Sequence, residues 1–143
     1  MSGERRIIIP PWAFNQCYRP CLSAGQFRQI YFGGAGSGKS VFLAGRAALD
    51  ALTGRNTLIV RQVARTLRHS CFNEVQKAAH RLGIADHFSL SRSDLSLTCR
   101  DNGAQILFLG LDDTEKIKSL TPQRGALTDI WMEEATECRY EDM

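Results

Sequence analysis

Eight consecutive residues, Gly33–Ser40, constrain the fold of this chain more than any other segment. They read GGAGSGKS, and their glycines permit backbone conformations that other residues disfavour. Residues 28–32 just before them, Arg-Gln-Ile-Tyr-Phe, predict a short strand. Residues 40–53 just after them carry an apolar stripe at helical spacing, which predicts a helix that Gly54 ends. The segment therefore predicts a strand, a tight glycine loop and a helix, in that order.

The same eight residues match the pattern G-x-x-x-x-G-K-[ST] of a phosphate-binding loop, or P-loop. Glycines let consecutive N–H groups point at one anion, and the start of the following helix adds further donors. Lys39 is predicted to reach the β- and γ-phosphates of ATP, and Ser40 to offer its hydroxyl to Mg²⁺. The spacing does not fit the G-x-G-x-x-G pattern of dinucleotide-binding folds. The predicted nucleotide ligands are Gly33, Gly34, Ala35, Gly36, Ser37, Gly38, Lys39 and Ser40.

The rest of the chain predicts an alternation of strands and helices. Residues 1–27 show no clear periodicity and are interpreted as an irregular lead-in. A strand is expected at 57–60, which is apolar throughout as in a sheet covered on both faces, followed by a helix at 66–82. Residues 94–99 and 104–109 around Asp101-Asn102-Gly103 predict a hairpin. A charged helical turn at 112–120 and a strand at 127–132 complete the expected elements. This order predicts an α/β fold with a mainly parallel sheet, flanking helices and an inserted β-hairpin.

Two acidic residues follow the last predicted strand. Glu133 and Glu134 come directly after Ile130-Trp131-Met132. An ATP-hydrolysing enzyme needs a carboxylate for its metal ion and a group that orients the attacking water. We assign Glu133 to the metal and Glu134 to the water, because successive residues of a strand point in opposite directions. The alternative is that Glu133, Glu134 and Glu137 are favourable acids at the start of a helix.

Composition and charge narrow the class of protein. The 143 residues suffice for one domain, and no apolar run approaches the length needed to cross a bilayer. An odd number of scattered cysteines, five, predicts reduced thiols in a cytoplasmic protein and no zinc site. Residues 1–81 contain 12 Lys and Arg against 3 Asp and Glu, whereas residues 82–143 contain 6 against 12. The basic half suits a polyanionic partner, although solvated helix faces would give the same charge.

Four blocks in order resemble the large subunit of the terminases of tailed phages and prophages, PBSX type. The blocks are GGAGSGKS, LIVRQVARTLRHS, FLGLDDTEKIKSL and IWMEEATE, within residues 26–138. The resemblance implies a P-loop NTPase fold of the ASCE or RecA-like kind. It also implies an ATP-hydrolysing motor that packs double-stranded DNA. The terminase small subunit and the portal protein are its implied partners.

The resemblance also carries over to single residues. Lys39 and Ser40 match the family's phosphate and Mg²⁺ residues, and Glu133 and Glu134 its metal-binding and catalytic acids. Arg61 matches an arginine that faces the nucleotide or the DNA path, unless it caps the sheet edge. The chain departs from many relatives at Ala35, where they carry an arginine, so a charge-stabilising arginine must come from elsewhere. Gln26 and Gln29 lie where related motors place an adenine contact.

The family's later elements have no counterpart among the residues of this sequence. Residues 28–143 are predicted to form a partial ATPase domain that lacks the family's later strands and its nuclease domain. An incomplete sheet exposes an edge, so self-association into a homo-oligomer is expected. Two alternatives stay open. One is another P-loop ATPase, such as a helicase or recombinase-like protein, and the other is an inactive truncated prophage fragment that only binds nucleotide.

Overall fold

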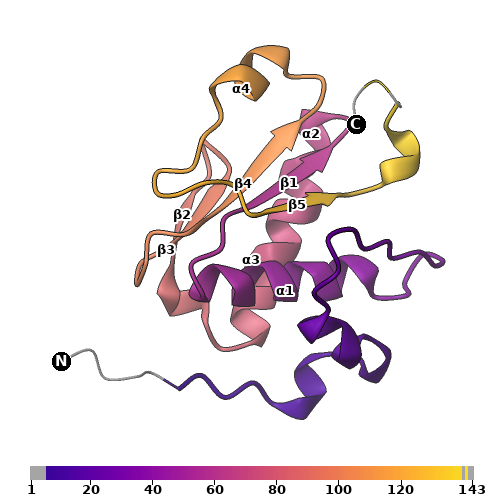
Figure 1. The fold of residues 1–143 in the computed structure, drawn as a ribbon, viewed down its shortest axis with the longest axis vertical. Helices are drawn as coiled ribbons and strands as arrows, with labels where there is room; N and C mark the ends of the chain where they lie inside the picture. Colours follow the sequence, from indigo (N-terminus) through magenta and orange to yellow (C-terminus); the bar gives the residue numbers. More distant parts are fainter. Residues whose placement is uncertain (1–5, 140, 142–143) are drawn as a thin grey trace.

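A five-stranded sheet forms the centre of the computed structural model, which describes residues 6–139 and 141 (Figure 1). Its strands are β1 (Thr57–Arg61), β2 (Phe88–Ser91), β3 (Ser96–Cys99), β4 (Gln105–Gly110) and β5 (Asp129–Met132). They lie in the order β2-β3-β4-β1-β5. β1 pairs in parallel with β4 and β5, whereas β3 pairs antiparallel with β2 and β4. The predicted α/β fold and its inserted hairpin are therefore confirmed, although the hairpin makes half of the strand pairings antiparallel. β2 was not predicted from the sequence.

The helices follow the sequence expectations closely. They are α1 (Lys39–Leu52), α2 (Ala64–Leu67), α3 (Asn73–Arg81) and α4 (Thr114–Ser119). A π-helical turn at Arg68–Phe72 joins α2 to α3, so that the predicted helix at 66–82 is a single helical run of changing type. The side chain of Asp113 caps α4 by accepting from the amide of Lys116. Within the described residues, no helix is long and apolar enough to cross a membrane.

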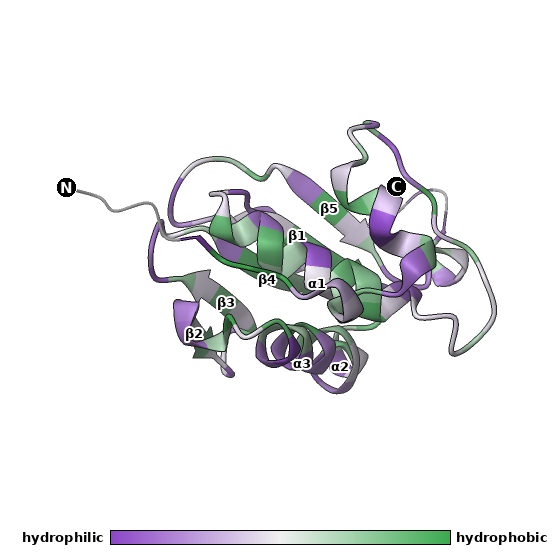
Figure 2. Cartoon of the chain, turned by 90° about the horizontal axis from the view of Figure 1, so that it is seen from below, coloured by the Kyte–Doolittle hydropathy of each residue, from purple (hydrophilic) through white to green (hydrophobic). Residues whose placement is uncertain are grey.

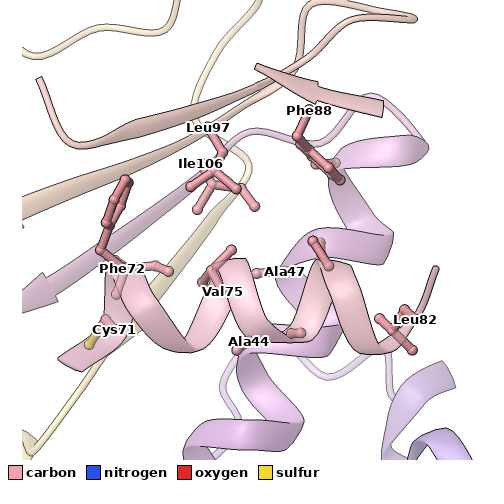
Figure 3. Close-up of a cluster of buried hydrophobic side chains, with 14 of the residues drawn as sticks. Ala44, Ala47, Cys71, Phe72, Val75, Leu82, Phe88, Leu97 and Ile106 are labelled. Carbon is pink, nitrogen blue, oxygen red and sulfur yellow. The ribbon is translucent and has the colours of Figure 1, made fainter. Parts of the chain in front are cut away.

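The main core lies between one face of the sheet and the helices α1 and α3. Figure 3 shows Val75 of α3 between Ala44 and Ala47 of α1 and the sheet residue Ile106. Alanines on α1 leave room for α3 to approach closely, and small residues at such contacts permit short distances between helix axes. Figure 2 shows the corresponding division of hydropathy, with hydrophobic positions along β1 and β4 and hydrophilic ones on the outer turns of α3.

The second face of the sheet is covered differently. Its apolar residues are Leu58, Val60, Leu107 and Leu109, and they form a separate small cluster. Leu111, Leu120, Leu127 and Met132 pack on that cluster. The expectation that β1 is buried on both faces is confirmed, since four of its five residues are buried. However, the cover on this side is the segment that contains α4 rather than a layer of long helices.

The predicted strand at residues 28–32 is absent, and this expectation was wrong. Residues 28–32 form no strand, and Phe27, Ile30 and Phe32 are 97%, 87% and 91% exposed. A strand requires a neighbour for its backbone groups, and β5 ends the sheet with β1 as its paired neighbour in the described structure. Side chains hold the segment instead, because Arg46 of α1 donates to the side chains of Gln29 and Tyr31 at 2.6 and 3.3 Å.

The lead-in before the glycine loop is more ordered than the sequence analysis predicted. It contains 3-10 helices at Pro11–Ala13 and Gln16–Ser23, while residues 1–5 lie outside the described part of the chain. Phe14 is buried and meets the ring of Phe42 edge-on, and the ring of Tyr18 stacks on Phe42 with centroids 4.9 Å apart. These aromatic contacts pack the lead-in against α1, next to the glycine loop.

Arg55 explains the polar start of β5, where Thr128 and Asp129 interrupt an otherwise apolar run. Its guanidinium donates two hydrogen bonds of 2.7 Å to the carboxylate of Asp129. Burial alone would raise the pKa of Asp129, but the hydrogen bonds from Arg55 and Thr128 bring it below its usual value. The ion pair therefore fixes the beginning of β5 beside the beginning of β1.

Asn56 is the buried polar residue that joins β1, β4 and the segment before β5. Its side-chain amide donates to the carbonyls of Arg124 and Ala126 at 2.8 and 3.0 Å, and its Oδ1 accepts from the amide of Gln105 at 2.8 Å. Its carbonyl also accepts from the amide of Thr128. Only 3% of Asn56 is exposed, so these groups satisfy one another without water.

Replacing Asn56 by alanine is expected to lower the free energy of unfolding by about 2 kcal/mol, because buried polar groups would lose their partners. Urea unfolding followed by circular dichroism measures this change. Asn15→Ala is the matched control, since Asn15 is exposed and its side chain only caps a 3-10 helix. Equal stability of the two variants would contradict the role of Asn56.

Candidate active site

The glycine loop curls at two left-handed glycines and leads directly into α1. Gly36 and Gly38 have φ angles of 75° and 85°, a region that residues with a Cβ atom rarely adopt. Gly38 is also the N-cap of α1, and its carbonyl accepts the first helical bond, from the amide of Phe42 at 2.9 Å. The amides of residues 39–41 therefore have no acceptor within the helix and can donate to an anion, whereas the amide of Ser37 already donates to the carbonyl of Gly34.

Lys39 lies over its own loop. Its ammonium group donates to the carbonyls of Gly33 and Gly34 at 2.7 and 3.2 Å, and to the hydroxyl of Ser37 at 3.2 Å. From the other side, the hydroxyl of Tyr18 donates to the carbonyl of Ser37 at 3.1 Å. The loop thus holds a positive charge among its backbone groups, and the predicted contact of Lys39 with the phosphates of ATP stays a prediction.

Ser40 and Glu133 meet although 93 residues separate them in the sequence. The hydroxyl of Ser40 donates to Oε1 of Glu133 at 2.6 Å. The other carboxylate oxygen, Oε2, accepts from the indole Nε1–H of Trp131 at 2.9 Å, and the backbone amide of Glu133 donates to the carbonyl of Val60. Parallel pairing of β5 with β1 brings the end of β5 to the start of α1, so the fold itself assembles this contact.

Glu134 turns out of the strand with an unusual backbone. It has φ 50° and ψ 52°, the left-handed conformation, which costs a residue with a Cβ atom about 1–2 kcal/mol. It begins the 3-10 turn Ala135–Glu137, in which the amide of Glu137 donates to the carbonyl of Glu134. Both Glu133 and Glu134 line the same cavity. The simple alternation of strand side chains therefore does not describe the pair, because Glu134 has already left the strand.

The cavity encloses about 380 Å³ between the glycine loop, the end of β5 and the helical run after β1. Pockets of this size bind small ligands. It is lined by Ala35, Gly36, Ser37, Gly38, Lys39, Ser40, Val41, Ser70, Cys71, Glu74, Glu133 and Glu134. Most of the residues that the sequence analysis selected thus share one cavity.

Four lining residues were not selected from the sequence as site residues: Val41 of α1, and Ser70, Cys71 and Glu74. Ser70, Cys71 and Glu74 belong to the π-helical turn and the first turn of α3, which form part of the cavity wall. A π turn adds a residue to one helical turn and shifts the faces that follow, and such turns are frequent at functional sites. Burial raises the pKa of Cys71 to about 11, so its thiol is neutral and weakly nucleophilic at pH 7.

The other candidates lie outside the cavity lining. The side chain of Gln29 accepts from Arg46 and Tyr31 and donates to the carbonyls of Ala24 and Gln26, so its amide contacts the protein itself. Gln26 is exposed. Arg61 forms an ion pair with Glu137, 3.7 Å from Nε to Oε2. Gly33 and Gly34 do not line the cavity, but their carbonyls accept hydrogen bonds from Lys39, which does.

Ser40 and Glu133 offer the donor chemistry that Mg²⁺ prefers. Both present oxygen atoms, and Mg²⁺ is usually held by one or two carboxylates together with several waters and phosphate oxygens. Within the described residues, no group of three or more His, Cys, Asp and Glu side chains forms a metal-binding cluster. The residues present therefore fit a metal ion that arrives with a phosphate ligand rather than one held by a protein cage.

Comparison with known proteins places the chain in a family. Residues 25–143 match the family described as phage terminase large subunit. The chain is 31% identical over 130 residues to the terminase large subunit of Bacillus phage SPP1, across 90% of this chain and 31% of that protein. It is 35% identical over 117 residues to the PBSX phage terminase large subunit of Bacillus subtilis strain 168, across 81% of this chain and 26% of that protein. The chain thus spans less than a third of these relatives, and it belongs to the phage terminase large subunit family.

Proposed function

We propose that this chain is the nucleotide-binding part of a DNA-packaging terminase, with a P-loop NTPase fold that binds ATP with Mg²⁺ and hydrolyses it. The observation that carries the proposal is the 2.6 Å contact between Ser40 and Glu133. It joins the start of the helix after the phosphate loop to the acid at the end of a parallel strand, in a cavity that Lys39 and Glu134 also line.

The proposed binding mode uses the loop and the start of α1. The triphosphate accepts hydrogen bonds from the backbone amides of residues 39–41 at the start of α1. The ammonium group of Lys39 turns from the carbonyls of Gly33 and Gly34 to the β- and γ-phosphates. Ser40 and Glu133 would hold the metal ion, which neutralises charge on the phosphate oxygens. Since Gln29 is committed to Arg46 and Tyr31, its proposed adenine contact would have to come from its aliphatic or backbone atoms.

The proposed reaction is an in-line displacement at the γ-phosphorus. Glu134 accepts a proton from a water molecule, whose oxygen forms the new bond to phosphorus while the bond to the β–γ bridging oxygen breaks. Catalysis then consists of positioning and charge stabilisation. Arg61 lies on the neighbouring strand and pairs with Glu137, so a stabilising arginine from another subunit remains part of the proposal.

The biological setting is proposed from the family. In the complete protein, hydrolysis would drive double-stranded DNA into a procapsid in the host cytoplasm. The terminase small subunit, the portal protein and further copies of the chain are the proposed partners. The net positive charge of the first 81 residues suits the DNA partner electrostatically, because phosphate contacts dominate the affinity of proteins for nucleic acid.

Replacing Lys39 by alanine is expected to weaken the binding of ATP and Mg²⁺ about 100-fold, because charge-assisted hydrogen bonds to phosphate oxygens are lost. Isothermal titration calorimetry with a slowly hydrolysed ATP analogue measures the affinity of the chain. Lys118→Ala is the matched control, since Lys118 is an exposed lysine of α4 outside the cavity lining.

The control variant should bind like the wild-type chain. Equal affinities for all three proteins would refute the phosphate-loop assignment. Magnesium-dependent binding without measurable turnover by the wild-type chain would favour the nucleotide-binding fragment over the motor.

A further inference from the structure

Glu133 is held at both of its carboxylate oxygens. Ser40 donates to Oε1 at 2.6 Å, and the indole Nε1–H of Trp131 donates to Oε2 at 2.9 Å. These donors come from different elements, one from the start of α1 and the other from β5 itself. A glutamate side chain has three rotatable bonds, so donors at both oxygens fix its direction far more than one would.

The strand geometry explains why Trp131 reaches Glu133. Residues two apart on an extended chain point to the same side, whereas Met132 between them belongs to the cluster on the other face of the sheet. In the register of the parallel pair, Trp131 lies opposite Ile59. Its side chain therefore enters the main core beneath α1 and α3.

The ring of Trp131 is a rigid support. Only 7% of the residue is exposed, and it is one of the buried members of the main core. Turning the ring would open that core, so the direction of the Nε1–H is set by packing. An indole N–H is a donor only, and a buried one requires an acceptor. The carboxylate of Glu133 meets that requirement, and the requirement in turn holds the carboxylate in place.

Packing alone does not account for a tryptophan here, because a phenylalanine ring would fill apolar space without needing an acceptor. Carboxylates that bind metal ions are commonly hydrogen-bonded by such supporting groups, and loss of the support typically costs 10- to 100-fold in metal affinity. The geometry at Glu133 has this form: one oxygen faces the hydroxyl that accompanies it at the metal site, and the other faces a rigid donor.

We propose that Trp131 is a positioning residue for the metal-binding carboxylate of Glu133, and that its indole N–H sets the magnesium affinity of the site. This inference rests on the proposed function, in which Ser40 and Glu133 hold Mg²⁺. It adds a requirement that is independent of the phosphate loop: the nucleotide site depends on a core residue that does not line the cavity.

The test compares two chemically identical substitutions. Trp131→Phe removes the N–H donor and retains an aromatic ring in the core, whereas Trp12→Phe makes the same change at the 72% exposed tryptophan of the lead-in. Binding of a fluorescent ATP analogue is followed by anisotropy while Mg²⁺ is titrated. The Mg²⁺ concentration for half-saturation should rise about tenfold in Trp131→Phe and stay unchanged in Trp12→Phe, with full binding of both at saturating Mg²⁺.

The outcomes separate the inference from the function on which it rests. If the wild-type chain binds nucleotide without any dependence on Mg²⁺, the proposed metal site fails, and the inference fails with it. If binding depends on Mg²⁺ and Trp131→Phe has the half-saturation of the wild type, the inference alone is overturned. Saturating Mg²⁺ also distinguishes a positioning effect from misfolding, since only the former is rescued.

A second measurement leaves Trp131 and its packing in the core in place. In the Trp12→Phe protein, Trp131 gives the single indole N–H resonance in a ¹⁵N–¹H spectrum. Adding Glu133→Ala should move this resonance upfield and speed its exchange with solvent at least about tenfold, because the N–H loses its acceptor. An unchanged shift and exchange rate would show that the hydrogen bond is absent in solution and would overturn the inference.

Discussion

Replacing Glu134 by glutamine is expected to slow ATP hydrolysis roughly 10²–10⁴-fold while the affinity for ATP and Mg²⁺ stays within about threefold of the wild type. Glutamine keeps the size of the side chain but cannot accept the proton of the attacking water. Binding is preserved because Lys39, Ser40 and Glu133 are unchanged. Phosphate release under single-turnover conditions measures the chemical step, and calorimetry measures the affinity.

Glu137→Gln is the matched control for this variant. Glu137 lies three residues later on the same 3-10 turn and pairs with Arg61 rather than lining the cavity. Its replacement should leave the rate of the chemical step within about threefold of the wild type, since surface ion pairs contribute little. Wild-type turnover by Glu134→Gln would assign the attacking water to another group, and the next candidate is Glu74, the third acid of the cavity lining.

Replacing Gly110 by alanine is expected to lower the free energy of unfolding by about 3 kcal/mol or more, because the added methyl group has no space. A Cβ atom at Gly110 would lie 2.4 Å from the backbone nitrogen and Cα of Ala64 and from its Cβ. Gly110 ends β4 and Ala64 begins α2, so relief of the clash requires β4 and α2 to separate. Urea unfolding measures the loss.

Gly25→Ala is the control for the change in backbone entropy. Nothing lies within 4 Å of a Cβ atom built at Gly25, and its φ angle lies outside the strained region. Its replacement should be neutral or slightly stabilising, by up to about 1 kcal/mol. If Gly110→Ala were as stable as Gly25→Ala, then the close approach of α2 to β4 would be wrong. Since α2 leads into the π turn, such a result would also contradict the position of Ser70 and Cys71 in the cavity wall.

The sequence predicted those parts of the fold that local chemistry determines. The glycine loop and the helix after it follow from backbone freedom and apolar spacing, and α1 begins at Lys39, one residue before the predicted start. The hairpin around Asn102-Gly103 follows from turn chemistry, and β3 and β4 pair as expected. Glu133 was identified because it follows an apolar run, and the structure adds the contact with Ser40 that a linear pattern cannot contain.

The remaining features depend on interactions between distant segments. Residues 28–32 have the composition of a strand, but a strand forms only when a partner satisfies its backbone. The π turn at Arg68–Phe72 has the same apolar spacing as an α-helix to within one residue, so the position of Glu74 in the cavity was not predictable. The left-handed conformation of Glu134 is likewise invisible in a sequence where glycine and asparagine are the usual markers.

Arg46 links the segment before the glycine loop to the helix after it. Its guanidinium donates to the side chains of Gln29 and Tyr31 and to the carbonyls of Cys21 and Ala24, so it ties residues 21–31 to the middle of α1. That segment carries exposed apolar side chains, with Phe27 the most exposed. The segment is thus fastened to the helix that follows the glycine loop rather than to the sheet. One side chain therefore connects an exposed apolar surface to the helix that begins at the glycine loop.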